Sequence, residues 1–183
     1  MQELKERIVK EGKVLPGNII KVDGFLNHRI DTELMTHIAE EFGKHFNMDE
    51  VTMILTAEAS GIALSAIVAQ HFHKPMIFAK KAKSDNIEGG LYQSDIFSYT
   101  YKKKVTLLVS KEWLSADDKV LIIDDFMANG EAMRGLCDIV TAAGATLVGI
   151  GCAVEKGFQG GGDRLRAAGV NLKSLAIIES AEP

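Results

Sequence analysis

The sequence lacks most of the features that mark secreted, membrane or disulfide-bonded proteins. It has only two cysteines, Cys137 and Cys152, both among apolar neighbours and in no Cys-x-x-Cys pair, so neither a disulfide framework nor a zinc ribbon is expected. No apolar run approaches the roughly 20 residues of a membrane helix. The first residues, MQELKERIVKEG, are charged throughout, which is not typical of a secretory signal. We therefore expect a cytoplasmic protein that does not bind a membrane.

Concentrated positive charge and catalytic nucleophile sets are also missing. The formal net charge is −4 and no basic face is visible, so nucleic-acid binding has no electrostatic basis. The closest histidines, His71 and His73, would diverge at i, i+2 on a predicted helix and could not chelate a metal. No Ser–His–Asp or Cys–His set is apparent. A length of 183 residues is enough for one α/β domain and short for two.

The most informative stretch is VLIIDDFMANGEA, residues 120–132. Its first four residues are apolar and predict a parallel strand buried on both faces. Asp124 and Asp125 follow, then a tight loop over 126–130, and a helix is predicted from about Glu131, with Gly144 in the place of a C-terminal cap. Open α/β sheets build ligand sites in this way, at the carboxyl ends of their strands.

The residue types in this stretch indicate the ligand. A loop of small residues that enters a helix can point backbone N–H groups at an anion, and the helix dipole adds positive charge. Two adjacent carboxylates suit a ribose diol or a Mg²⁺ ion beside that anion. Together they predict a ribose 5-phosphate site. The alternative is an acidic strand end in an α/β protein of another kind.

The rest of the chain repeats the alternation of strands and helices. A helix is predicted over residues 2–11, and Asp31 is a good N-cap for the next one. Further strands are predicted over 51–56, 75–80 and 146–154, with a final edge strand over 172–178. The strand over 51–56 is followed by a small-residue loop and a helix, as the strand over 120–123 is. These two loops could hold the two ends of one polyphosphorylated sugar. Alternatively, this second loop is an ordinary strand–helix connection.

Three segments are less regular. Residues 14–30 are too apolar for a solvated linker and too interrupted for a core element, so they are expected to fold over something. Within 80–111, the second half alternates as in a β-hairpin. The first half, with Lys80, Lys81 and Lys83, predicts either a basic mobile lid or a solvated loop. Gly160 to Gly162 predict a loop.

The central stretch resembles the 5-phosphoribosyl-1-diphosphate (PRPP) motif of the phosphoribosyltransferases. Over nearly the whole chain, the sequence is similar to the bacterial xanthine phosphoribosyltransferases, in the segments KVDGFLNHRID, TAEASGIA, SKEWLSADDKVLIIDDFMANGEA and GIGCAVEKGFQ. The resemblance implies a phosphoribosyltransferase-type fold in one domain over 1–183, with a hood from about 13–30 and 155–183. It further implies transfer of a phosphoribosyl group from PRPP to N9 of xanthine, Mg²⁺ bound with PRPP, and a homodimer.

The resemblance also assigns roles to particular residues. Asp124 and Asp125 are the implied catalytic pair. The implied ligand contacts are Ala128, Asn129, Gly130, Glu131 and Ala132 for PRPP; Glu58, Ala59, Ser60 and Gly61 for pyrophosphate; and Ile20, Asn27 and Lys156 for xanthine. Without the resemblance, Asn27 is better explained as a turn-capping amide, and Lys156 could be a surface lysine at a strand end.

The chain departs from the family pattern at its phosphate loop. Many phosphoribosyltransferases carry Thr-Gly-Gly-Thr there, whereas Asn129 to Ala132 offer no hydroxyl. Glu131 brings negative charge near the expected phosphate, so its side chain should point outward. Ala128 stands where hypoxanthine-guanine enzymes have an aspartate. That leaves no obvious acid–base group in the loop. Another 6-oxopurine, guanine or hypoxanthine, is an alternative base. A non-catalytic PRPP sensor is a further alternative, although such sensors in purine repressors carry a DNA-binding domain for which we expect no room.

Overall fold

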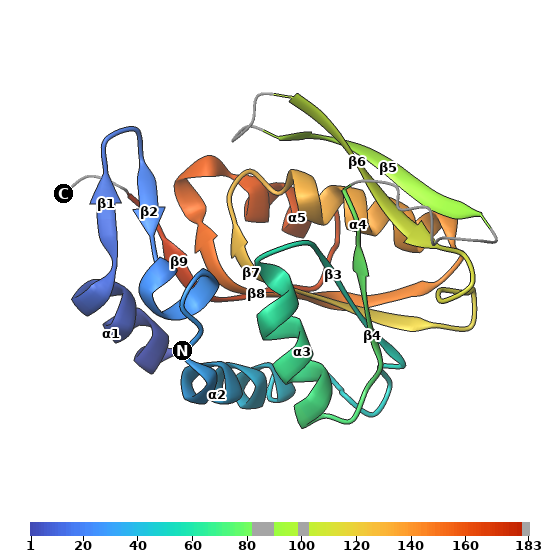
Figure 1. The fold of residues 1–183 in the computed structure, drawn as a ribbon, viewed down its shortest axis with the longest axis horizontal. Helices are drawn as coiled ribbons and strands as arrows, with labels where there is room; N and C mark the ends of the chain where they lie inside the picture. The colour runs from blue at the N-terminus through green and yellow to red at the C-terminus, as the bar shows by residue number, and fades with distance from the viewer. Residues whose placement is uncertain (82–89, 99–102, 181–183) are drawn as a thin grey trace.

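The fold is built around a parallel sheet of five strands in the order β4-β3-β7-β8-β9 (Figure 1). The computed structural model describes residues 1–81, 90–98 and 103–180. The strands are β3 (Met53–Ala57), β4 (Met76–Ala79), β7 (Lys119–Met127), β8 (Thr146–Lys156) and β9 (Leu172–Ile178). The predicted α/β class with an open parallel sheet is confirmed, and so is the position of the last strand at a sheet edge.

The central strand β7 is buried on both faces, as its continuous apolar run predicts. Val120 and Ile122 pack into the core under α4 (Glu131–Ala142), whereas Leu121 and Ile123 pack into the core under α2 (Thr32–Gly43) and α3 (Gly61–His71). The prediction that the strand ends before the two aspartates is wrong. Parallel pairing with β8 continues to Met127, so the acidic pair belongs to the strand itself.

The predicted helix boundaries agree with the structure where a side chain or a glycine fixes them. The Asp31 carboxylate accepts a hydrogen bond from the Leu34 N–H at 3.1 Å and caps α2. Helix α4 begins at Glu131, and Gly144, with φ of 70°, follows its last turn. The first helix, α1 (Gln2–Glu11), also lies where it was predicted. By contrast, α3 ends at His71, and His73 has left the helix with φ of 53°, so the prediction that both histidines are helical is wrong.

The segment after α1 is more regular than expected. Strands β1 (Lys13–Leu15) and β2 (Ile19–Lys21) form an antiparallel hairpin, and a π-helix over Asp23–Asn27 follows. Phe25 and Leu26 of that π-helix are fully buried, which explains why the segment is too apolar for a linker. The terminal amine of Met1 donates to the Leu175 carbonyl at 2.6 Å and so joins α1 to β9 (Figure 1).

The predicted β-hairpin is present as β5 (Leu91–Ser98) and β6 (Lys103–Ser110), which pair antiparallel. Its inner face, with Ile96 and Leu107, packs into the same core as α4, and Figure 1 shows the hairpin lying along that helix. Tyr99 and Tyr101, which alternate with Phe97 in the predicted hairpin, lie outside the described residues. Most of the predicted lid, 82–89, also lies outside them. In the described part of the chain, no helix is long and apolar enough to cross a membrane.

The glycine run near the C-terminus is not simply a loop, and that prediction is wrong. A 3₁₀ turn (Gly157–Gln159) leads into a short helix, α5 (Gly161–Ala167). Glycine disfavours helices on its own, so tertiary contacts decide this conformation. The contact is with the predicted phosphate loop: a Cβ on Gly161 would lie 2.6 Å from the Asn129 carbonyl carbon.

Candidate active site

The two aspartates lie at the carboxyl end of β7 and are both buried. Asp125 is 1% exposed and Asp124 is 8% exposed. The Ser60 hydroxyl donates to Oδ1 of Asp125 at 2.8 Å. The other carboxylate oxygen, Oδ2, is buried without a hydrogen-bond partner among the described residues. An orphaned carboxylate oxygen is a strong acceptor, so this side of the pair is suited to a hydroxyl or a cation.

Asp124 is held in a constrained environment. Its Oδ1 accepts the Asp125 N–H at 3.0 Å, and an added Cβ on Gly61 would collide with both this oxygen and the hydroxyl of Thr56. Glycine at the start of α3 therefore lets the carboxylate approach the helix backbone closely. Burial, and next the negative charge of Asp125, raise the pKa of Asp124 well above its ordinary value.

The predicted phosphate loop follows β7 and enters α4. Gly130 has φ of 80°, a left-handed conformation that glycine adopts without strain. The side-chain oxygen of Asn129 accepts the Glu131 N–H at 3.2 Å and closes the turn. The remaining N–H groups at the start of α4 can face an anion, as the small-residue loop predicts.

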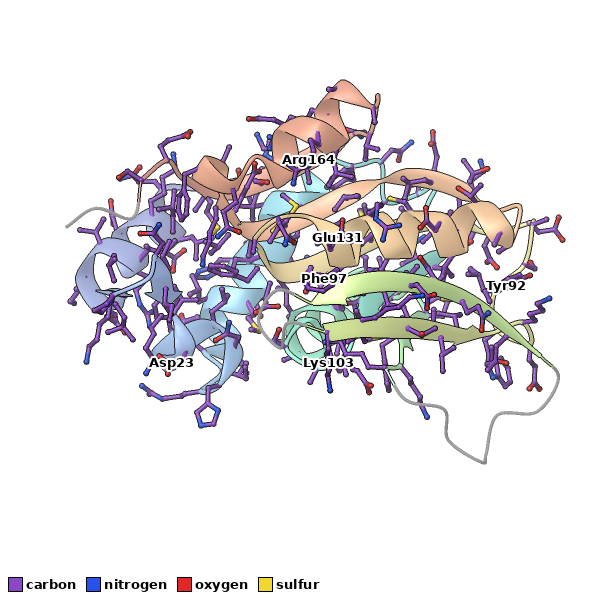
Figure 2. The ribbon with its side chains drawn as sticks, turned by 90° about the horizontal axis from the view of Figure 1, so that it is seen from above. Asp23, Tyr92, Phe97, Lys103, Glu131 and Arg164 are labelled. Atoms are coloured by element: carbon purple, nitrogen blue, oxygen red, sulfur yellow. The ribbon has the colours of Figure 1, made fainter. Side chains whose placement is uncertain are left out.

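Glu131 points away from the loop, as expected from its charge. Its Oε2 lies 3.1 Å from Nη2 of Arg134 and accepts the Phe97 N–H at 3.4 Å. The Arg134 guanidinium lowers the pKa of Glu131, so the carboxylate is ionised and paired. Figure 2 shows Glu131 at the start of α4, facing Phe97 on the hairpin. The negative charge that a phosphate would meet is thus partly neutralised.

The second predicted loop, Glu58 to Gly61, joins β3 to α3. The Glu58 carboxylate accepts the backbone N–H of Lys81 at 2.5 Å, which ties this loop to the residues after β4. Ser60 contacts Asp125, as described above, so the loop touches the acidic pair directly. The two strand–loop–helix units therefore meet at one edge of the sheet.

The three residues predicted to contact a base come from distant parts of the chain. Ile20 lies on β2, Asn27 ends the π-helix, and Lys156 ends β8. The Lys156 ammonium donates to the Asn18 carbonyl at 3.0 Å and lies 5.5 Å from the centre of the Phe126 ring. Burial lowers the pKa of Lys156. Lys156 and the β1–β2 hairpin together form one side of the site.

Two adjoining cavities bring most of these residues together. The smaller cavity, of about 350 Å³, is lined by ten predicted residues: Ile20, Asn27, Glu58, Ser60, Asp124, Ala128, Asn129, Gly130, Glu131 and Ala132. The larger cavity, of about 790 Å³, shares Ala128, Asn129, Glu131 and Ala132 with it and is also lined by Lys156. Of the predicted residues, Ala59, Gly61 and Asp125 line neither cavity and support the site from behind.

Among the residues that line the larger cavity, sequence reasoning missed the polar side chains of Gln159 and Arg164. Arg164 lies on α5, in the stretch that was predicted to be a loop. Its Nη2 donates to the Asn129 carbonyl at 2.8 Å. The available signal was the run Gly160 to Gly162, because consecutive glycines often mark a close approach between backbones.

The fold and the site agree with a comparison against protein families. The sequence model described as "Phosphoribosyl transferase domain" matches residues 25–166, which include the acidic pair and both loops. The chain belongs to the phosphoribosyltransferase family.

Curated relatives refine this assignment. A protein of Bifidobacterium longum named "Xanthine phosphoribosyltransferase" is 53% identical over 184 residues, covering 100% of this chain and 95% of the relative. A protein of the same name from Lachnoclostridium phytofermentans is 53% identical over 98% of this chain and 93% of its own length. The resemblance inferred from the sequence is thereby confirmed.

Solved structures support the fold. An adenine phosphoribosyltransferase from Giardia lamblia, complexed with 9-deazaadenine, matches with a TM-score of 0.82 at 20% identity, over 97% of this chain and 98% of that one. The enzyme from Trypanosoma brucei matches with a TM-score of 0.77 at 21% identity, over 95% and 79%. At these identities the likeness establishes the architecture, not the base.

Proposed function

We propose that this chain transfers the 5-phosphoribosyl group from PRPP to N9 of xanthine, releasing pyrophosphate and xanthosine 5′-monophosphate. The observation that carries the proposal is the smaller cavity, which joins Asp124, the phosphate loop and Asn27 in one space. The chain is also 47–53% identical to relatives named for this activity. The reaction is purine salvage and needs no protein nucleophile.

The acidic pair acts on the ribose ring. Carboxylate oxygens of Asp124 and Asp125 accept hydrogen bonds from the ribose hydroxyls. Asp124 lines the smaller cavity and is the first such acceptor, whereas Asp125 lies buried beside it and must turn toward the cavity to take part. As the bond to pyrophosphate breaks, the ribosyl ring gains oxocarbenium-like positive charge, which nearby carboxylates stabilise. Burial raises the pKa of Asp124 in the free chain, and the positive charge of the ribosyl ring favours its ionised form. Catalysis is then electrostatic stabilisation and positioning.

The two loops hold the two ends of PRPP. Backbone N–H groups of residues 128–132 bind the 5′-phosphate at the start of α4, where the helix dipole also favours an anion. Residues 58–61 face the leaving pyrophosphate from the neighbouring strand. Because β3 and β7 are adjacent in the sheet, the two anion sites lie side by side at its carboxyl edge.

A Mg²⁺ ion fits this donor set. Asp124 and Asp125 are the residues that would hold it or its water ligands, since oxygen ligands are what Mg²⁺ prefers. The described residues contain no group of three or more His, Cys, Asp or Glu that could hold a metal alone. The substrate phosphates would therefore complete the coordination. When bound, the ion neutralises charge on the departing pyrophosphate.

The base is bound by the proposed hood, residues 13–30 and 155–183, which completes the single domain 1–183. Lys156 donates to an exocyclic oxygen of the purine after leaving the Asn18 carbonyl, to which it donates at 3.0 Å in the free chain. The Asn27 amide donates to the second oxygen, and Ile20 packs on the ring. These contacts hold N9 over the ribose carbon.

The oligomeric state of the protein and its cellular compartment are part of the same proposal. We infer a cytoplasmic homodimer, with the hairpin around Phe97 as the contact. Phe97 is 44% exposed, so its ring is available to a second copy of the chain.

Release of pyrophosphate, measured with PRPP, Mg²⁺ and one base at a time, tests the proposed function. Xanthine should give the fastest release, with guanine and hypoxanthine slower and adenine inactive. Faster release with guanine or hypoxanthine would reassign the base and retain the reaction. Binding of PRPP without release for any base would instead indicate a sensor and refute the enzymatic proposal.

A further inference from the structure

Helix α5 and the phosphate loop touch backbone to backbone. A Cβ on Gly130 would lie 3.3 Å from the Cα of Gly161, and a Cβ on Gly161 would lie 2.7 Å from the Gly130 nitrogen. Side chains at either position would push the two segments apart. The two glycines therefore allow α5 to pack directly against the backbone of the loop.

Arg164, in the first turn of α5, bridges this contact. Its Nη2 donates to the Asn129 carbonyl at 2.8 Å, and its Nη1 donates weakly to the Gln159 carbonyl at 3.5 Å. A guanidinium carries five N–H groups, so several remain for a ligand. Figure 2 labels Arg164 on α5. Its side chain is exposed and lines the larger cavity together with Asn129.

The helix that carries Arg164 is fixed to the sheet. Arg166 makes a bidentate pair with Glu155, with Nη1–Oε1 at 3.1 Å and Nη2–Oε2 at 2.6 Å, and the Ser174 hydroxyl donates to the same carboxylate. Glu155 is 1% exposed, and an added Cβ on Gly162 would collide with it. Bidentate pairs of this kind fix orientation as well as distance. Arg164 is thus presented to the loop from a rigid support.

The loop itself lacks what a phosphate needs beyond backbone N–H groups. Residues 129–132 contain no hydroxyl and no cation, and Glu131 is anionic, although it is paired with Arg134. Three basic residues line the larger cavity. Lys81 lies just after β4 and also lines the smaller cavity, Lys156 is engaged with Asn18, and Arg164 donates to the backbone of the loop. Guanidinium groups match phosphate oxygens in geometry and charge.

We propose that Arg164 is a phosphate-binding residue of this chain, which positions the loop through the Asn129 carbonyl and donates its remaining N–H groups to the 5′-phosphate of PRPP. The inference rests on the proposed function. It assigns to α5 the contacts that hydroxyl groups of the loop cannot make here.

The test compares Arg164→Met, which keeps the apolar stem, with Arg164→Lys, which keeps the charge but loses the fork. Lys10→Met is the control, because Lys10 is an exposed cation on α1 that lies outside the proposed hood and lines neither cavity. Loss of a charge-assisted hydrogen bond should raise the KM for PRPP by about tenfold or more in Arg164→Met, and less in Arg164→Lys. The KM for xanthine should stay within about twofold in every variant, and the control should match the parent.

Two results would overturn the inference: a KM for PRPP unchanged in Arg164→Met, or equal rises in both KM values, which would indicate a merely structural role. If the parent forms no nucleotide from any oxopurine, the proposed function fails, and Arg164 is tested separately. Calorimetry with ribose 5-phosphate then decides. Weaker binding by Arg164→Met than by the parent supports the phosphate contact, and equal binding refutes it.

Discussion

The Lys156 ammonium donates a hydrogen bond to the Asn18 carbonyl at 3.0 Å, across 138 positions of sequence. This bond joins the end of β8 to the turn of the N-terminal hairpin. It occupies the donor that is proposed to hold an oxygen of the base. A base that offers an acceptor can replace the carbonyl at little cost, whereas one that offers an amino group cannot.

The first prediction concerns these base contacts. Lys156→Ala should weaken use of all 6-oxopurines together, because each has the same exocyclic oxygen. Asn27→Ala should chiefly narrow the gap between xanthine and hypoxanthine, which differ by the oxygen at C2. Since an unpaired buried donor costs about 1–3 kcal/mol, the parent should prefer xanthine by about ten- to a hundredfold.

Specificity constants for both bases in the parent and the two variants check this prediction. A loss confined to xanthine in Lys156→Ala would place the lysine elsewhere on the base. An unchanged preference in Asn27→Ala would remove the amide from the C2 contact.

The second prediction concerns the acidic pair. Asp124→Asn or Asp125→Asn should lower turnover by about two orders of magnitude or more, because the amide cannot supply the negative charge that stabilises the ribosyl ring. Both substitutions keep the size of the side chain, so circular dichroism should show an intact fold. A folded double variant with full activity would contradict the ribose assignment.

The third prediction follows from the pKa of Asp124, which burial raises well above the ordinary value of 3.8. Between that value and the raised one, the folded chain binds the proton more tightly than the unfolded chain. Stability therefore falls as the pH rises through this interval, and the loss remains at neutral pH. Asp124→Asn removes the titrating carboxyl group, so this pH-dependent loss of stability should be absent from the variant.

Urea denaturation from acidic to neutral pH checks this result, with Asp117→Asn, at an exposed residue shortly before β7, as the control. The parent and the control should lose stability relative to Asp124→Asn as the pH rises. Parallel curves for all three would show that Asp124 is not the titrating group.

Some parts of the fold could be predicted from the sequence alone. A side chain that caps its own helix, as Asp31 does, and an apolar run buried on both faces, as in β7, depend on local rules that the sequence displays directly. The acidic pair was found for the same reason. Its place inside the strand was missed, because continued pairing with β8 outweighs the low strand preference of aspartate.

The contacts of α5 could not be predicted from local rules. Gly161 begins a helix because the Asn129–Gly130 backbone lies against it, and Arg164 reaches a loop 35 positions earlier. The hairpin before the π-helix was missed for a similar reason. Its strands β1 and β2 have three residues each, and Pro16 and Gly17 between them indicated only a turn.

The fourth prediction is that the protein is a dimer. The proposed contact is the exposed Phe97 on the hairpin, which a second copy of the chain would cover. Sedimentation at micromolar protein should therefore give twice the chain mass of 19.9 kDa. Phe97→Glu should shift the equilibrium toward monomer. A parent that sediments as a monomer would refute the homodimer.

Competition between bases tests the central claim most directly. Equimolar xanthine, guanine, hypoxanthine and adenine, offered together with limiting PRPP and Mg²⁺, should yield xanthosine 5′-monophosphate as the main nucleotide, identified by its mass. Adenosine 5′-monophosphate should be absent, because adenine presents an amino group to Lys156. Formation of the adenine nucleotide alongside that of xanthine would contradict the account of this site.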